Sequence, residues 1–151
     1  CSSDLIAISS YHRGLELKKD LVTFLPQKKQ PVKDFGPLTE ESGDYPEYAF
    51  KVADAVAGGK AERGIVICYS GIGVSVSANK VKGIRAALCQ TVEQAELSRK
   101  HTNANILALP AGFLTTETAK QIVEKWLVTS FEGGRHEERI NKIKSIEDRQ
   151  K

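Results

Sequence analysis

The sequence lacks the features that mark secreted, membrane-spanning and nucleic-acid-binding proteins. Its three cysteines, Cys1, Cys68 and Cys89, cannot form a closed disulfide framework, so we expect a reducing compartment such as the cytoplasm. No apolar run approaches the roughly 18 residues of a membrane span, and no signal peptide opens the chain. The net charge is only +3, with no dense run of lysine and arginine, so we expect no nucleic-acid partner. Methionine is absent as well, and we expect the natural start to lie upstream or to have been processed.

What remains is the composition of an ordinary globular domain. Hydrophobic residues make up 40% and charged residues 27% of 151 residues, which suits one domain spanning 1–151. Strand and helix patterns alternate along it, which predicts one Rossmann-like α/β/α domain with a five-stranded parallel sheet. We expect strands at 5–8, 32–35, 65–67, 84–88 and 105–109. We expect helices at 15–25, 49–56, 74–80, 91–100 and 116–129, and a strongly charged last helix at about 135–148.

The segment from Gly64 to Lys80 carries the chemistry. An apolar strand ends at Cys68, a turn with glycines two apart follows, and a helix then begins. Free backbone N–H groups and the positive end of the helix would point to one spot, which makes an anion site and favours a thiolate on Cys68. Val76 stands where a dinucleotide fingerprint needs its third glycine, and no P-loop motif follows. The alternative is a turn whose glycines serve only close packing.

Ligands of parallel α/β sheets bind beyond the carboxyl ends of the strands. The candidate residues there are Tyr11 and His12 after the first strand, 68–73 after the third, and Pro110 after the fifth. His12 is one of three histidines, with His101 and His136. Each of the three also has a simpler interpretation, as a solvated or packed residue.

Arg135 and Arg139 lie four residues apart near the start of the last helix, so they share one helix face. Two guanidinium groups there suit a phosphate, which each can bind with two parallel hydrogen bonds. The alternative is a set of surface salt bridges with Glu137 and Glu138.

Taken together, these segments resemble the ribose-5-phosphate isomerase type B and galactose-6-phosphate isomerase family over nearly the whole chain. The motifs that carry the resemblance are H-x-G with E-L-K at 12–18, D-Y-P at 44–46, C-x-S-G-I-G at 68–73, A-N-K at 78–80, R-A-A-L at 85–88, S-R-x-H at 98–101, A-N-I-L-A at 104–108 and G-G-R-H-x-x-R-I at 133–140.

The resemblance implies a metal-free and cofactor-free interconversion of an aldose phosphate and a ketose phosphate through an enediolate. His101 would open the sugar ring, and Cys68 would move the proton between C2 and C1. Ser70 would position the thiol or a sugar hydroxyl. Backbone N–H groups of 70–73 would stabilise the enediolate oxygen. Arg135, Arg139 and His12 would hold the phosphate, and the family implies a homodimer or homotetramer with sites shared between subunits.

The chain departs from the family pattern at positions near the expected site. Tyr11 replaces an aspartate, Tyr69 replaces a glycine, Thr102-Asn103 follow His101 in place of asparagine and then aspartate or serine, and Pro110 replaces a glycine. These departures indicate a changed substrate or a weakened activity, not a changed fold. The full set of expected substrate-binding residues is Tyr11, His12, Tyr69, Gly71, Ile72, Gly73, Thr102, Asn103, Arg135 and Arg139.

We expect ribose 5-phosphate and ribulose 5-phosphate as the substrate pair. The alternatives are a hexose 6-phosphate, a non-phosphorylated tetrose or pentose, or a non-catalytic subunit that binds sugar phosphate.

Overall fold

The computed structural model describes residues 4–39 and 43–150, so Cys1 lies outside the described residues. The described strands are β1 (Ile6–Ser10), β2 (Val32–Asp34), β3 (Arg63–Cys68), β4 (Ala86–Leu88) and β5 (Ile106–Pro110). The described helices are α1 (Leu15–Gln27), α2 (Tyr45–Ala57), α3 (Ile72–Ala78), α4 (Val92–Thr102), α5 (Thr116–Val128) and α6 (Arg135–Arg149). Short 3-10 helices, η1 (His12–Gly14) and η2 (Ala111–Phe113), follow β1 and β5.

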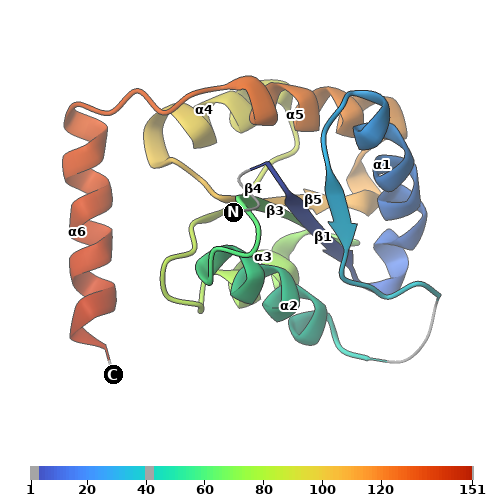
Figure 1. The fold of residues 1–151 in the computed structure, drawn as a ribbon, viewed down its shortest axis with the longest axis horizontal. Coiled ribbons are helices and arrows are strands. Elements are labelled where there is room, and N and C mark those ends of the chain that lie inside the picture. The colour runs from blue at the N-terminus through green and yellow to red at the C-terminus, as the bar shows by residue number, and fades with distance from the viewer. Residues whose placement is uncertain (1–3, 40–42, 151) are drawn as a thin grey trace.

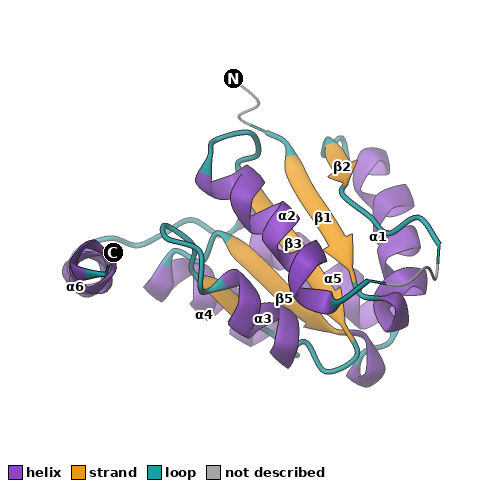
Figure 2. Cartoon of the chain, turned by 90° about the horizontal axis from the view of Figure 1, so that it is seen from below, coloured by secondary structure: helices purple, strands orange, loops and turns teal. Residues whose placement is uncertain are grey.

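The five strands are parallel and lie in the order β2-β1-β3-β5-β4. Helices α2 and α3 cover one face of the sheet, and α1, α4 and α5 cover the other (Figures 1 and 2). The predicted three-layer α/β/α fold is therefore confirmed. The chain passes outward from β1 to β2 and then returns to the other side of β1 as β3. The point where the strand order reverses, next to which such sheets bind ligands, lies between β1 and β3.

Alternate strand residues build two unlike hydrophobic layers. The layer toward α1, α4 and α5 contains large side chains, among them Ile8, Ile65, Ile67, Leu107, Leu109 and Trp126. The layer toward α2 and α3 contains Ile84 and Ile106 but is richer in small side chains, among them Ala7, Val66, Cys68, Ala108, Val52 and Ala53. A Cβ added to Gly64 would come within 2.3 Å of Val52 Cγ1, so α2 packs very close to β3. This close packing fixes the position of α2 against β3, the strand that ends at Cys68.

The first helix is longer than the sequence pattern predicts. We expected the helix to end at residue 25, before Pro26, but α1 ends at Gln27 with Pro26 inside the last turn. Pro26 cannot donate to the carbonyl four residues earlier, so the helix loses this one hydrogen bond, but the Pro26 carbonyl still accepts a hydrogen bond from Lys29 N at 2.9 Å. A proline this close to the helix end therefore removes little of the hydrogen-bond ladder.

Other element bounds agree with the predictions to within a few residues. Helix α2 begins at Tyr45, before the first periodic apolar residue, and α3 begins at Ile72, two residues before the predicted start. Pro110, expected in the loop after the fifth strand, is the last residue of β5. Thr91, the first residue of the predicted helix 91–100, is the N-cap of α4, because its side chain accepts the Gln94 N–H.

The last helix stands beside the layered body (Figure 1). Of its side chains only His136 and Ile140 are buried, whereas Ile143 and Ile146 are 43% and 48% exposed. Its far end is tied to the segment before β4 by the Lys82–Asp148 ion pair at 2.9 Å. These two isoleucines of a helix predicted to be strongly charged are therefore about half uncovered in a single chain.

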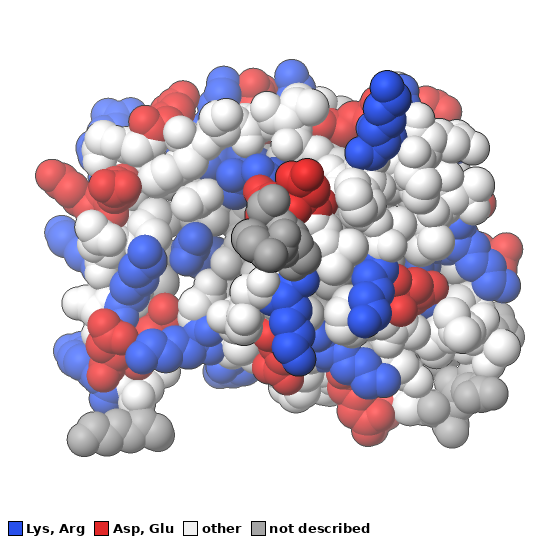
Figure 3. Space-filling view, viewed as in Figure 1, with Lys and Arg blue, Asp and Glu red and all other residues white. Residues whose placement is uncertain are grey.

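Basic and acidic side chains are intermingled on the face shown in Figure 3. That view shows no broad area of one sign of charge, in line with the small net charge of +3. Among the described helices, none combines the length and the apolar composition that crossing a bilayer requires.

Candidate active site

The ends of three neighbouring strands bring the first group of expected residues together. Ser10 at the end of β1 pairs with Ile67 of β3, and Cys68 pairs with Pro110 at the end of β5. The Tyr11 N–H donates to the carbonyl of Ile67 at 2.8 Å. The chain after β1, the turn after β3 and η2 therefore meet at one edge of the sheet, which we call the Cys68 edge.

Cys68 lies at the bottom of the turn that leads into α3. Its side chain is buried, and its sulfur accepts a hydrogen bond from the Gly71 backbone N–H at 3.2 Å. This contact fixes the direction of the Cys68 side chain at the start of α3. The turn thus orients the thiol as the sequence predicts.

The turn depends on Gly71 for both conformation and space. Gly71 has φ of +75°, in the left-handed region, and a Cβ there would come within 2.5 Å of Leu88 Cδ1. Gly73 has its own steric reason, since a Cβ there would come within 2.6 Å of the Tyr45 ring. Close packing, the alternative reason for these glycines, therefore applies as well.

Two of the expected oxyanion donors are already engaged. The Gly71 N–H is directed at Cys68 Sγ, and the Ile72 N–H donates to Ser70 Oγ at 3.2 Å. Within the described chain no hydrogen bond engages the N–H groups of Ser70 and Gly73. These two groups are the donors available to a bound anion.

Aromatic side chains surround the end of β1. The rings of Tyr11 and His12 lie 4.1 Å apart, and Tyr45 from the start of α2 meets Tyr11 edge-on at 6.0 Å. His12 is exposed and Tyr11 is half-buried. Tyr11, which replaces the family's aspartate, thus packs between the site's histidine and α2.

Tyr69 points toward η1 and η2. Its ring contacts Phe113 edge-on at 5.7 Å and carries the guanidinium carbon of Arg13 at 4.0 Å from its centroid. The ring is 42% exposed. Arg13 was not among the expected site residues, because nothing in its local sequence marks it.

A second group of expected residues gathers around His101. The rings of His101 and His136 stack at 4.3 Å and 10°, and Glu132 Oε1 lies 3.5 Å from His136 Nε2 and 4.0 Å from His101 Nε2. Burial, together with the nearby His101 and Arg135, lowers the pKa of His136, against a smaller opposite effect of Glu132. Sequence reasoning had missed Glu132, which precedes the two glycines before α6.

These three side chains bring ligand-type atoms within 4.8 Å of one another. The two imidazole rings are nearly parallel, however, and nitrogen lone pairs lie in the ring planes. Lone pairs of stacked rings run side by side and do not converge on one ion. In this arrangement the group holds the His101 ring and does not form a metal site.

The end of α4 is fixed by a buried arginine. Arg99 donates to Ala104 O at 2.7 Å and to Asn103 Oδ1 at 2.9 Å, and Asn103 adopts the left-handed conformation at φ of +48°. The hydroxyl of Thr102 donates to Ser98 O at 2.7 Å. Thr102 and Asn103 thus serve to end the helix and set the position of His101.

Arg135 and Arg139 are both exposed on α6. In the described chain neither guanidinium forms an ion pair, so the surface salt bridges with Glu137 and Glu138 are not formed. The two arginines are therefore available to an anion.

The two groups lie at opposite edges of the sheet. Helix α4 returns from the end of β4 to the start of β5, and the residue before β5, Asn105, accepts the N–H of Gly64 near the start of β3. Gly64 is four residues before Cys68, or about 13 Å along the strand. In Figure 1 the arrowhead of β1 points away from α6. One chain therefore does not bring His101 and the arginines to Cys68.

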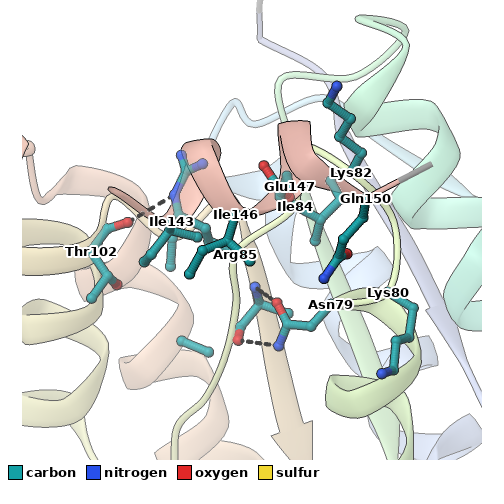
Figure 4. A pocket seen from close by; sticks show the side chains of 13 residues that line it. Asn79, Lys80, Lys82, Ile84, Arg85, Thr102, Ile143, Ile146, Glu147 and Gln150 are labelled. Carbon is teal, nitrogen blue, oxygen red and sulfur yellow. Dashed lines mark hydrogen bonds between the residues drawn. The ribbon is translucent and has the colours of Figure 1, made fainter. Parts of the chain in front are cut away.

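A groove of about 750 Å³ lies between α6 and the segment before β4 (Figure 4). Ile84, Ile143 and Ile146 give it an apolar lining, and Asn79 is bound within it to the backbone of Ala86. Thr102 is the one expected site residue that lines it. The groove is therefore separate from the Cys68 edge.

The family model described as Ribose/Galactose Isomerase matches residues 6–143. The chain belongs to the ribose/galactose isomerase family. This confirms the family that the motifs indicate, including an activity of the aldose–ketose isomerase type.

Individual relatives of this family match over almost their full length. Ribose-5-phosphate isomerase B of Escherichia coli (strain K12) is 44% identical over 144 residues, which cover 95% of this chain and 97% of that one. The structure of the Clostridium thermocellum ribose-5-phosphate isomerase B has a TM-score of 0.94 at 47% identity and covers 96% of this chain and 98% of that one. The Mycoplasma genitalium enzyme, solved with bound ribulose-5-phosphate, has a TM-score of 0.92 at 44% identity and 97% coverage of both chains.

Proposed function

We propose that this member of the ribose/galactose isomerase family interconverts ribose 5-phosphate and ribulose 5-phosphate. The observation that carries the proposal is the Cys68 turn, where a buried thiol receives the Gly71 N–H beside two unengaged N–H groups. A relative of 44% identity was solved with ribulose-5-phosphate bound, which supports a pentose phosphate as the substrate.

Cys68 acts as the base in this proposal. Its thiolate removes the proton from C2 of the open-chain aldose, and the resulting thiol returns a proton to C1, so the thiolate is regenerated at each turnover. The hydroxyl proton on O2 passes to O1 as the carbonyl moves from C1 to C2. The Gly71 N–H donates to the sulfur, which carries the charge before the first proton transfer and after the second. Ser70, whose hydroxyl accepts the Ile72 N–H, keeps its own proton to donate to a sugar hydroxyl.

The enediolate oxygen is stabilised by donors that are fixed before the charge develops. The N–H groups of Ser70 and Gly73 have this role, since they are held by the turn and the first turn of α3. One such donor is worth roughly 3–4 kcal/mol in the transition state.

Ring opening and phosphate binding use residues from the other edge of the sheet. His101 is the acid and base at the ring oxygen, and Arg135 and Arg139 bind the phosphate together with His12. Glu132 and the stacked ring of His136 hold His101 in place. Thr102 and Asn103 contribute by fixing the end of α4.

A second copy of the chain completes the site. Because His101, Arg135 and Arg139 lie at the edge opposite Cys68, they reach the thiol of a partner and not that of their own chain. A two-fold dimer would form two such sites from the same pair of surfaces.

Exposed apolar side chains support this arrangement next to both groups. Ile72 and Val76 of α3 are 58% and 55% exposed and lie four residues apart, on one helix face beside the Cys68 turn. Ile143 and Ile146 form the uncovered edge of α6 on the other side. Burying both faces against a second copy would remove them from water.

The test of the function is a proton NMR assay in deuterated buffer with ribose 5-phosphate. We expect loss of the C2 proton signal together with the appearance of ribulose 5-phosphate. If the folded protein gave no exchange over hours, the assay would contradict this substrate pair. Proton exchange on a hexose 6-phosphate in the same assay would then identify another sugar as the substrate. Saturable binding of a sugar phosphate without proton exchange would identify a non-catalytic binding subunit.

A further inference from the structure

Arg13 is an unneutralised cation at the rim of the Cys68 edge. It lies in η1 directly after His12, is exposed, and makes no hydrogen bond or ion pair within the described chain. Its guanidinium group lies over the ring of Tyr69, with the guanidinium carbon 4.0 Å from the ring centroid. The ring holds the guanidinium by a cation–π contact and leaves its N–H donors free.

Tyr69 is itself held in place by the segment after β5. Its carbonyl accepts the Gly112 N–H at 2.9 Å, and its ring meets Phe113 edge-on. A Cβ on residue 112 would come within 2.3 Å of Tyr69 Cε1, so the ring fits only because residue 112 is glycine. The position of Arg13 is therefore built from three separate segments of the chain.

The surroundings of this guanidinium favour an anion. The residues that meet at this rim, Tyr11, His12, Tyr69, Gly112 and Phe113, include no carboxylate. The guanidinium of Arg13 lies over the Tyr69 ring, and a guanidinium with free N–H groups can bind a phosphate with two parallel hydrogen bonds. His12, already assigned to the phosphate, lies one residue away.

We propose that Arg13 binds the phosphate group of the substrate and that Tyr69 positions it. The inference rests on the proposed function, because it takes a sugar phosphate as the ligand. In this proposal Tyr69, which replaces the family's glycine, supports Arg13 at the rim of the site and does not block the site. Both residues then determine specificity for a phosphorylated sugar.

The first test compares steady-state kinetics of Arg13→Gln with the unchanged protein on ribose 5-phosphate. We expect KM to rise about tenfold, equivalent to about 1.4 kcal/mol, with kcat within about twofold, because a phosphate contact exists in ground and transition states alike. The matched control is Lys51→Gln, which removes a cation lying 5.1 Å from the Tyr48 ring on α2. This control should leave KM unchanged. An unchanged KM in Arg13→Gln overturns the proposal.

The role of Tyr69 is tested by a pair of substitutions. Tyr69→Ala should raise KM about as much as Arg13→Gln, and the double variant should be no worse than either alone. Tyr69→Phe keeps the ring and should retain the original KM. Additive losses in the double variant would refute a positioning role.

A binding measurement separates this proposal from the proposed function. Titration of each folded variant with inorganic phosphate, followed by calorimetry, should give an affinity about tenfold weaker for Arg13→Gln. If Arg13→Gln binds phosphate about tenfold more weakly than the unchanged protein, but the unchanged protein does not isomerise ribose 5-phosphate, the Arg13 assignment stands and the proposed function fails. If phosphate affinity does not change, or if the substitution alters only self-association, the Arg13 assignment is wrong.

Discussion

Replacing Gly71 by alanine should damage both stability and turnover. At φ of +75° an alanine costs about 1–2 kcal/mol in backbone strain. Its Cβ would also come within 2.5 Å of Leu88 Cδ1 and 3.1 Å of the Pro110 nitrogen. Leucine can rotate away but the Pro110 backbone cannot, and overpacking of this kind costs about 1–3 kcal/mol more. We therefore expect a loss of about 2–5 kcal/mol in the free energy of unfolding.

The matched control is Gly59→Ala. Gly59 has almost the same φ, +77°, but a Cβ there would meet nothing within 4 Å, so only the strain of about 1–2 kcal/mol applies. Urea unfolding of both variants at one protein concentration measures the difference, since the stability of an oligomer depends on concentration. If Gly71→Ala were no less stable than Gly59→Ala, the packing argument would be refuted.

Three further predictions concern the chemistry of the site. Cys68→Ala should lower the rate of C2 proton exchange by at least about 10³-fold while leaving phosphate binding intact. Cys89→Ala is the control and should keep the exchange rate, because burial raises the pKa of the Cys89 thiol to about 11. Equal losses of exchange in the two variants, measured by the NMR assay, would contradict the role of Cys68 as the base. Arg139→Ala should raise KM about tenfold with little change in kcat, and an unchanged KM would restore the salt-bridge interpretation. The pKa of His136 is lowered in the folded chain, so at acid pH the unfolded chain binds more protons than the folded one. The free energy of unfolding should therefore be highest above about pH 6.5 and should fall as the pH drops through the folded pKa. Urea unfolding at pH 7.5 and 5.5 measures this fall, which should be smaller in His136→Gln than in the unchanged protein.

Local patterns were enough to predict the elements and the position of the Cys68 turn, whereas the roles assigned to the site residues stay predictions. The β-branched run before Cys68 and the Thr91 cap each depend on neighbouring residues, and both were found where expected. The Cys68 turn was predictable for the same reason, since a strand, two glycines and a helix start follow one another directly. His101 lies at the opposite edge of the sheet from Cys68 because α4 runs back from the end of β4 to the start of the parallel strand β5. This position depends on the topology of the sheet and cannot be predicted from the spacing of the motifs.

Contacts between distant segments were not predictable from local patterns. Lys18 is fully buried, where its ammonium is 2.9 Å from Asp34 Oδ1, although a lysine on a helix is normally exposed. Arg99 is likewise buried, and its burial, with the nearby Arg63 and Arg85, lowers its pKa to about 10. The direction of the Tyr69 side chain depends on the glycine at position 112, in a segment whose proximity only the fold reveals.

The most direct measurement mixes two inactive variants. Cys68→Ala and His101→Asn each remove one half of the proposed site. If the site is shared by two copies, exchanging subunits between the two should form mixed dimers with one intact site, and activity should recover to about a quarter of the unchanged protein's in a two-fold dimer. No recovery, with subunit exchange confirmed, would contradict an isomerase site completed by a second copy.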